Sequence, residues 1–480
     1  MIDLLDHPLP RAPGQASIYC AQHLCTPVPM SDREPADLLI EPRWLLPVSP
    51  ADTVLEAQAV AVAGGRILAV GPAVELRQRF AVRERIVRAH HALLPGLVNA
   101  HTRAAHTLLR GLPVRGPRAR SLGDWVGLER RAGGADFVRD GMRLAIAEML
   151  RAGITCFADL SPLPAEAART AAAAQVRALI ALPVSDAPTG SGEDATAHLA
   201  KAEALWDEYR AHPRIGLYFA PLRESALSDA TLTRLRRVAD ELDARIALHL
   251  AESPAQREGY AGEDAPEPGG VEDGAPRERR ALKRPALERL ASLGLLRPGF
   301  TAVGALECNA GGVQLLERHG ASLISCPQAE LRLGARPERL PLLADDRTAL
   351  GTDSPAAAGA FDLLAEMRTA ALLCGLSARE ALRLATLGGA TVLGLGAQIG
   401  SIEPGKAADL TCLDVSGLGC ARAGAVADAV VFAATRSQVS DVWTSGRAAV
   451  SAGRVMLFDE TELSSLPEVW ARRLAFEAAA

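Results

Sequence analysis

Long apolar runs are missing from this sequence, and so is a secretory signal. No stretch approaches the roughly 18 apolar residues of a membrane span, and the first 37 residues lack a basic segment followed by an apolar one. We therefore expect no membrane partner and a cytoplasmic location. An excess of positive charge is also missing: the formal net charge is −5, which argues against a nucleic-acid partner. The expected partner is a small neutral molecule.

Closely spaced cysteine pairs are also absent, and aromatic residues are few. The eight cysteines are scattered and none forms a C-x-x-C pair, which is typical of reduced thiols rather than a disulfide framework. Aromatic residues make up 4% of the chain, so the core must be mostly aliphatic. No G-x-G-x-x-G follows the first strand candidate of the central segment, which disfavours an open dinucleotide-binding sheet.

The patterns that are present divide the chain into two kinds of unit. Since a single core stops growing near ~250 to 300 residues, 480 residues predict one large domain and one small one. Short β-rich runs separated by turns occupy residues 37–90 and return over residues 397–457. We expect these two segments to form one small β-sandwich domain built from both termini.

Residues 91–396 predict a metal-hydrolase-type (β/α)₈ barrel of the TIM class. Short apolar strands alternate there with amphipathic helices, which indicates βα units and a parallel sheet. Eight strands are the number that closes such a barrel. The eight candidates are residues 93–100, 154–160, 176–183, 215–221, 245–252, 300–306, 321–327 and 348–354.

Three segments do not follow these strand and helix patterns. Residues 1–36 are Pro-rich and irregular, and Met30 competes with Met1 as the start of the protein. Residues 254–286 are rich in Gly, Pro, Glu and Asp, so we expect a mobile loop over the barrel mouth. Residues 458–480 are expected to be a C-terminal tail.

The candidate chemistry lies at the C-terminal ends of the predicted strands, where barrels of this kind carry their reacting groups. His101 follows the first strand, His249 lies in the fifth, and Asp353 follows the last. Two imidazoles and a carboxylate that converge on one mouth would form a three-ligand metal site with an open position. Glu252 stands three residues after His249, and His106 lies just beyond His101.

Four stretches resemble the ATZ/TRZ group of the amidohydrolase superfamily, which includes s-triazine chlorohydrolases and deaminases of S-adenosylhomocysteine and 5-methylthioadenosine. The resemblance runs from about Asp37 to about Val455. It implies hydrolytic deamination or dechlorination of a nitrogen heterocycle with one divalent metal, zinc or iron. The stretches are LLPGLVNAHTRAAHTLLRGLP, FVRDGMRLAIAEMLRAGITCFADL, GTDSPAAAGAFDLLAEMRTAALL and IGSIEPGKAADL.

The resemblance assigns a role to four matching residues. His101 corresponds to the first histidine of the family's H-x-H motif, and His249 to the ligand on the fifth strand. Asp353 corresponds to the last ligand, and Glu252 to the group that shuttles the proton.

Three positions depart from the family pattern. The second H-x-H histidine is Arg103, whose guanidinium has no lone pair to give a metal. The histidine after the sixth strand is Gly304, and the substrate-contacting histidine after the fourth strand is Leu222. His106 is expected to be a pocket wall rather than a replacement ligand.

These departures predict a weakened metal site and weak or lost activity. Arg103 would repel a divalent ion and can instead pair with Asp353 or Glu252. Three hypotheses remain open at this point: a weakened hydrolase, a metal-free pseudoenzyme that serves as a ligand-binding or structural partner protein, and a metal-independent reaction at Arg103 and Glu252. We expect a small heterocyclic ligand and a homo-oligomer in each case.

Overall fold

The computed structural model covers the candidate site and both predicted domains. It describes residues 33–51, 53–112, 129, 134–186, 195–221, 227–250, 286–304, 310–332, 342–343, 346–417, 419–420 and 426–477. Residues 1–32 and 251–285 lie outside this part, so the N-terminal extension with Met30 and nearly all of the predicted loop at 254–286 lie outside it too.

Each of the eight predicted strand segments contributes one strand to a single parallel sheet. The strands follow one another in chain order across this eight-stranded sheet. They are β6 (Leu97–Thr102), β7 (Ile154–Asp159), β8 (Arg177–Val184), β9 (Ile215–Pro221), β10 (Ile246–His249), β11 (Phe300–Val303), β12 (Ser322–Ser325) and β13 (Thr348–Leu350).

The first and last strands meet where the candidate ligands lie. Thr102 at the end of β6 forms a parallel bridge with Asp353, just after β13. The backbone N–H groups of Thr352 and Asp353 both donate to the carbonyl oxygen of His101, at 3.0 Å each. These bonds join the two edges of the sheet, as a (β/α)₈ barrel requires.

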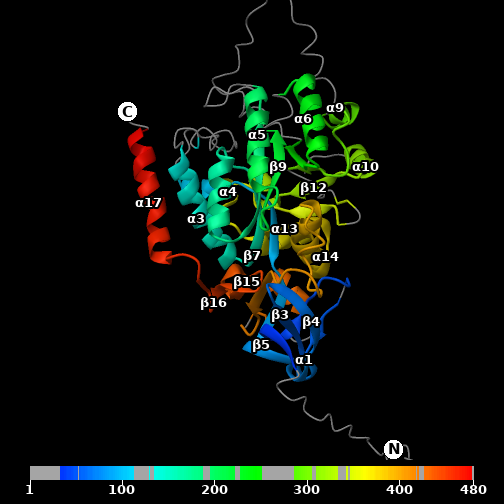
Figure 1. Cartoon of the computed structure of the whole chain (residues 1–480), viewed down its shortest axis with the longest axis vertical. Helices are drawn as coiled ribbons and strands as arrows, with labels where there is room; N and C mark the ends of the chain where they lie inside the picture. Colours follow the sequence, from blue (N-terminus) through cyan, green and yellow to red (C-terminus); the bar gives the residue numbers. More distant parts are fainter. Residues whose placement is uncertain are drawn as a thin grey trace, which may run out of the picture.

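Helices cover the outside of the barrel, which forms the upper part of the molecule in Figure 1. The longer ones are α3 (Ala135–Arg151), α4 (Pro164–Ala173), α5 (Ala195–Tyr209), α6 (Asp229–Glu241), α9 (Ala286–Ser292), α10 (Ala310–Arg318) and α13 (Leu363–Cys374). Shorter helices are η2 (Ala104–Leu109), α11 (Pro327–Arg332), α12 (Pro355–Ala358), α14 (Ala378–Arg383), η4 (Leu384–Gly388), α15 (Gly389–Val392), α16 (Val426–Asp428), η5 (Ala429–Ala433) and η6 (Arg436–Gln438).

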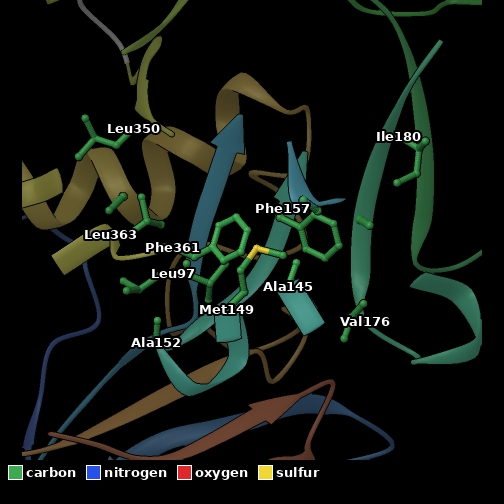
Figure 2. Packing of buried hydrophobic residues seen from close by; sticks show 14 of the residues in the cluster. Leu97, Ala145, Met149, Ala152, Phe157, Val176, Ile180, Leu350, Phe361 and Leu363 are labelled. Atoms are coloured by element: carbon green, nitrogen blue, oxygen red, sulfur yellow. The ribbon is translucent and has the colours of Figure 1, made fainter. Parts of the chain in front are cut away.

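Helix α3 illustrates why these segments are helical. Val138, Met142, Ala145 and Met149 recur at spacings of three and four residues and are all buried, so one face of α3 packs on the barrel. Figure 2 shows Met149 beside Phe157 of strand β7 and Phe361 of the loop before α13.

The small domain is built from both ends of the chain, as predicted. Its nine-stranded sheet joins β5 to β14 in antiparallel pairing, and these strands come from opposite termini. The strands are β1 (Glu34–Leu45), β2 (Leu55–Glu56), β3 (Gln58–Ala63), β4 (Arg66–Pro72), β5 (Phe80–Pro95), β14 (Leu410–Asp414), β15 (Val439–Thr444), β16 (Arg447–Ser451) and β17 (Arg454–Val455), with helix α1 at Ala73–Arg79.

The boundary between the two domains falls inside the first predicted strand segment. Residues 93–95 belong to β5 of the small domain, and the barrel strand begins only at Leu97. Gly96 stands between them and donates its N–H to the carbonyl oxygen of Asp409 at 2.8 Å. A β-carbon at Gly96 would lie 2.7 Å from Cβ of Thr155, so only glycine fits this crossing point.

The small domain contacts the N-terminal ends of the barrel strands. Arg177, the first residue of β8, donates to Oδ2 of Asp409 at 3.1 Å. Thr411 of β14 donates to the carbonyl oxygen of Gly153, just before β7, at 2.7 Å. The candidate ligands lie at the opposite, C-terminal ends of the strands.

The C-terminal segment was expected to be a tail, but most of it is a helix, α17 (Glu460–Glu477). Trp470 is buried, stacks edge-on against Phe137 of α3 with ring centroids 5.2 Å apart, and donates Nε1–H to Asp140 at 3.1 Å. Figure 1 shows α17 beside α3. Widely spaced apolar positions and an internal Pro467 conceal this helix in the sequence. Within the described ranges, no helix is both long and apolar enough to cross a membrane.

Candidate metal centre

His101, His249 and Asp353 come together at the C-terminal end of the barrel, although 252 positions separate the first from the last. One nitrogen or oxygen atom from each lies within 4.8 Å of the others. Nε2 of His101 is 2.9 Å from Nε2 of His249 and 3.7 Å from Oδ1 of Asp353. His101 belongs to β6, His249 ends β10, and Asp353 follows β13, so three separate strands supply the group.

Asp353 is held in a backbone conformation that few non-glycine residues adopt. Its φ is 49°, in the left-handed region. The hydroxyl of Thr102 donates to the carbonyl oxygen of Asp353 at 3.0 Å, and the N–H of Asp353 donates to the carbonyl oxygen of His101. The closure of the barrel therefore fixes this strained residue, and such strain is common at functional sites.

The electrostatics of His249 and Asp353 favour the protonation states in which these two residues can bind a metal. Burial lowers the pKa of His249 to about 3, and the nearby His101 and Arg103 act in the same direction, so its imidazole is neutral. Burial alone would raise the pKa of Asp353, but the contact with His101 and the positive charges around it hold that pKa below its usual range. A neutral imidazole and an ionised carboxylate are ligand forms.

A metal of the zinc class fits this donor set. Two imidazoles and one carboxylate are ligands that zinc commonly takes in catalytic sites, where a fourth position stays open. Oδ1 of Asp353 is buried and has no hydrogen-bond partner among the described residues, so its lone pairs are available to bind a metal. His101, His249 and Asp353 thus form the candidate metal group.

Arg103 lies beside this group. Its side chain is 8% exposed, and Nε lies 3.8 Å from Oδ1 of Asp353. The two groups are close enough to form an ion pair but too far apart to form a hydrogen bond. Nε has no hydrogen-bond partner in the part of the chain that is described. The predicted pairing with Asp353 is present as a charge contact only, because no hydrogen bond joins the two side chains. Glu252, the other predicted partner, lies outside the described residues.

Gly304 faces the metal group from the end of β11. Its φ is 73°, and a β-carbon built there would lie 3.4 Å from Nδ1 of His249. A side chain at this position would therefore touch a candidate ligand. Leu222, the third departure from the family pattern, lies outside the described ranges.

His106 is buried but does not belong to the metal group. Its Nδ1 is 2.8 Å from Oγ of Ser354, and its Nε2 is 3.2 Å from Oε1 of Glu129. The ring therefore connects the turn after β13 to Glu129.

Sequence reasoning missed two buried acids near Arg103. Burial raises the pKa of Asp159 to about 7, although the N–H of Ala104 donates to its Oδ1 at 2.6 Å. Burial also opposes the charge of Glu129, but His106 and Arg103 lower its pKa overall. Asp159 is the last residue of β7, so the rule applied to the other strand ends could have found it. Glu129 stands in a stretch with no strand signal.

Two family models match this chain. The model described as "Amidohydrolase family" matches residues 92–449. A second model, "Imidazolonepropionase-like composite domain, bacteria", matches residues 59–81 in the small domain.

Full-length relatives are similar to the chain over nearly its whole extent. A 5-methylthioadenosine/S-adenosylhomocysteine deaminase of Teredinibacter turnerae is 32% identical over 456 residues, which cover 93% of this chain and 99% of that protein. A protein of the same name from Saccharophagus degradans is 32% identical and covers 92% of this chain and 97% of its own.

Solved structures are also similar to this chain over nearly its whole length. A zinc-bound adenosine deaminase of Xanthomonas campestris is 34% identical and superposes with a TM-score of 0.82 over 92% of this chain and 100% of its own. A zinc complex of the atrazine chlorohydrolase of Arthrobacter aurescens, 20% identical, superposes with a TM-score of 0.75 over 90% of this chain and 100% of its own, and it supports the fold alone.

Proposed function

Because this chain belongs to the amidohydrolase family, we propose that it descends from a hydrolase of nitrogen heterocycles and now has a weakened metal group and weak or lost activity. The substrate class that fits best is an adenosine-like base, because relatives at 32% and 34% identity are named deaminases of such compounds. The reaction would be hydrolysis of a C–N bond other than a peptide bond.

His101, His249 and Asp353 are the residues that would hold a divalent ion, zinc or iron. Such an ion supplies the Lewis acidity that makes water a nucleophile at neutral pH. The protein's own contribution is to present two imidazole nitrogens and a carboxylate from three strands. Glu252 is proposed, from the family resemblance, to move the proton between water and the leaving amine.

One observation carries the proposed weakening: a buried arginine lies 3.8 Å from the carboxylate oxygen that a metal would need. At that range, with an effective dielectric near ~20, two unit charges interact by about 4 kcal/mol. Arg103 therefore attracts Asp353 and repels any cation that competes for the same oxygen. Gly304 weakens the centre further, because it offers no side chain beside His249 at a position where the family has a histidine.

Metal content tests this proposal directly. We expect the purified protein to hold well under one equivalent of zinc or iron after mild dialysis, measured by elemental analysis. Arg103→His should raise zinc affinity at least about tenfold, since it replaces a charge with a ligand. The matched control is Arg110→His, a change in a partly exposed arginine paired with Glu148.

Three outcomes would contradict the proposal. Stoichiometric metal in the wild type after dialysis would show an intact centre. An unchanged zinc affinity in Arg103→His, or an equal gain in Arg110→His, would show that Arg103 does not oppose the metal.

A metal-free ligand-binding protein is the second candidate, and one contact favours it. The two Nε2 atoms of His101 and His249 are 2.9 Å apart, so one ring can donate a hydrogen bond to the other without an ion. Calorimetry with an adenosine-like ligand, with and without a chelator, separates the candidates. Affinity that is insensitive to the chelator supports the metal-free binder, and affinity that falls with the chelator supports the weakened hydrolase.

A further inference from the structure

A cavity lies at the end of the barrel opposite the candidate metal group. It has a volume of about 270 Å³ and opens between the N-terminal ends of β8, β9 and β10. The end of α5 forms one wall, and residues 393–398, where the chain leaves the barrel for the small domain, form another. Junctions between domains are common places for ligand sites.

Arginines dominate the polar lining of this cavity. Two of them have carboxylate partners: Arg177 pairs with Asp409 at 3.1 Å, and Arg210 pairs with Asp207 at 3.8 Å. Arg214 and Arg245 also line the cavity, and neither has a carboxylate oxygen within 4.0 Å among the residues that the structure describes. The cavity therefore has an excess of positive charge.

Arg245 is the more constrained of the two. It is partly buried, and one of its terminal nitrogens donates to the carbonyl oxygen of Val392 at 3.1 Å. Its guanidinium packs over Gly394, where an added β-carbon would lie 2.7 Å from Cζ, so the backbone is shaped around this cation. Burial lowers the pKa of Arg245, which the nearby Asp243 offsets only in part. A partly buried cation that no carboxylate contacts directly is costly.

The rest of the lining is apolar. Leu179, Leu217 and Leu393 are buried side chains that face the cavity, and Trp206 adds an aromatic surface. A volume just under the ~300 Å³ at which drug-sized sites begin limits the occupant to a small molecule. The lining suits a compound with a flat or apolar body and one anionic group.

We propose that this cavity, lined by Arg214 and Arg245, binds a small organic anion, a ring that carries a carboxylate or a phosphate monoester. The anionic group pairs with the two arginines, and the ring packs on the leucines and Trp206. Strand β10 starts directly after Arg245 and ends at His249, so at ~3.3 Å per residue the cavity lies about 13 Å from the metal group. It is a separate site, and its occupancy does not require the metal.

Calorimetry with the full-length protein tests the proposal. The probes are benzoate, phenyl phosphate and inorganic phosphate at millimolar concentrations. We expect one of the two ring compounds to bind more tightly than inorganic phosphate, and the tighter one identifies the anionic group. Arg245→Gln should weaken that binding at least about tenfold, because it removes a charge-assisted hydrogen-bond donor.

The matched control is Arg237→Gln, which removes the same charge from an exposed arginine on α6 paired with Glu241 at 3.9 Å. It should bind like the wild type. Arg245→Lys keeps the charge and should retain more affinity than Arg245→Gln, which guards against a general folding defect. Absence of binding by both ring compounds, no preference for either over inorganic phosphate, or equal losses in Arg237→Gln and Arg245→Gln would overturn the proposal.

Discussion

The two ends of this barrel are formed by the same eight parallel strands but differ in the charge of their side chains. At the C-terminal end, three buried acids, Asp353, Asp159 and Glu129, interact electrostatically with one arginine, Arg103. At the N-terminal end, four arginines line a cavity in which Asp243 is the only carboxylate among the lining residues that the structure describes. Parallel strands place side chains from distant segments together at either end, so the residue types that meet there favour a cation at one end and an anion at the other.

The largest effect that sharpens this comparison should come from Asp353→Asn. This change leaves the buried guanidinium of Arg103 without its ion-pair partner at 3.8 Å, and breaking such a pair costs about 3 to 5 kcal/mol. Urea unfolding measures the loss. Asp207→Asn is the matched control, because its pair with Arg210 is exposed and should contribute under about 1 kcal/mol. Similar losses in both variants would remove the distinction.

The next effect is a pH dependence that sets Asp159 apart from Asp353. The pKa of Asp159 is raised from 3.8 to about 7, so between these values the folded state holds more protons than the unfolded state, and stability falls as pH rises. The pKa of Asp353 is lowered, so its contribution is instead lost as pH falls below the usual range.

Asp159→Asn should therefore flatten the fall in stability between pH ~4 and ~7 and raise stability at pH 7 by up to about 4 kcal/mol. Urea unfolding across that window, for wild type and variant, provides the measurement. A parallel pH profile in the two proteins would mean that burial does not hold a proton on Asp159.

A third prediction concerns activity at the C-terminal end. Ammonia release from adenosine-like substrates and chloride release from triazines should be absent or very slow in the wild type with added zinc, and should rise in Arg103→His/Gly304→His. The gain in rate comes with a cost of about 1 to 2 kcal/mol in stability, since Gly304 has φ 73°. Wild-type turnover near ~1 s⁻¹ or faster would show a working centre.

The smallest effect is expected at the N-terminal end. Arg245→Gln removes a partly buried cation that has no carboxylate within 4.0 Å in the described ranges, so stability should change by less than about 1 kcal/mol, or rise. Thermal unfolding without added anion gives the value. A loss as large as that of Asp353→Asn would mean that both ends pair their charges equally well.

Much of the fold could be predicted because the relevant signals are local. Short apolar runs between amphipathic helices located all eight barrel strands, and the resemblance carried by the stretches around His101 and Asp353 identified the family. Helix α17 was missed, because its buried Trp470 gains a partner only when α3 lies beside it.

The sequence by itself determined which residue types stand at the strand ends, and so the candidate metal group of His101, His249 and Asp353. Only the tertiary structure decided how far Arg103 lies from Asp353 and which acids surround it. It also decided that arginines from three different segments of the chain meet in one cavity. The reason is physical: a periodicity reports which face of an element is buried, whereas the strength of a charge contact depends on distance and on exclusion of water, and both are set by packing between segments far apart in the chain.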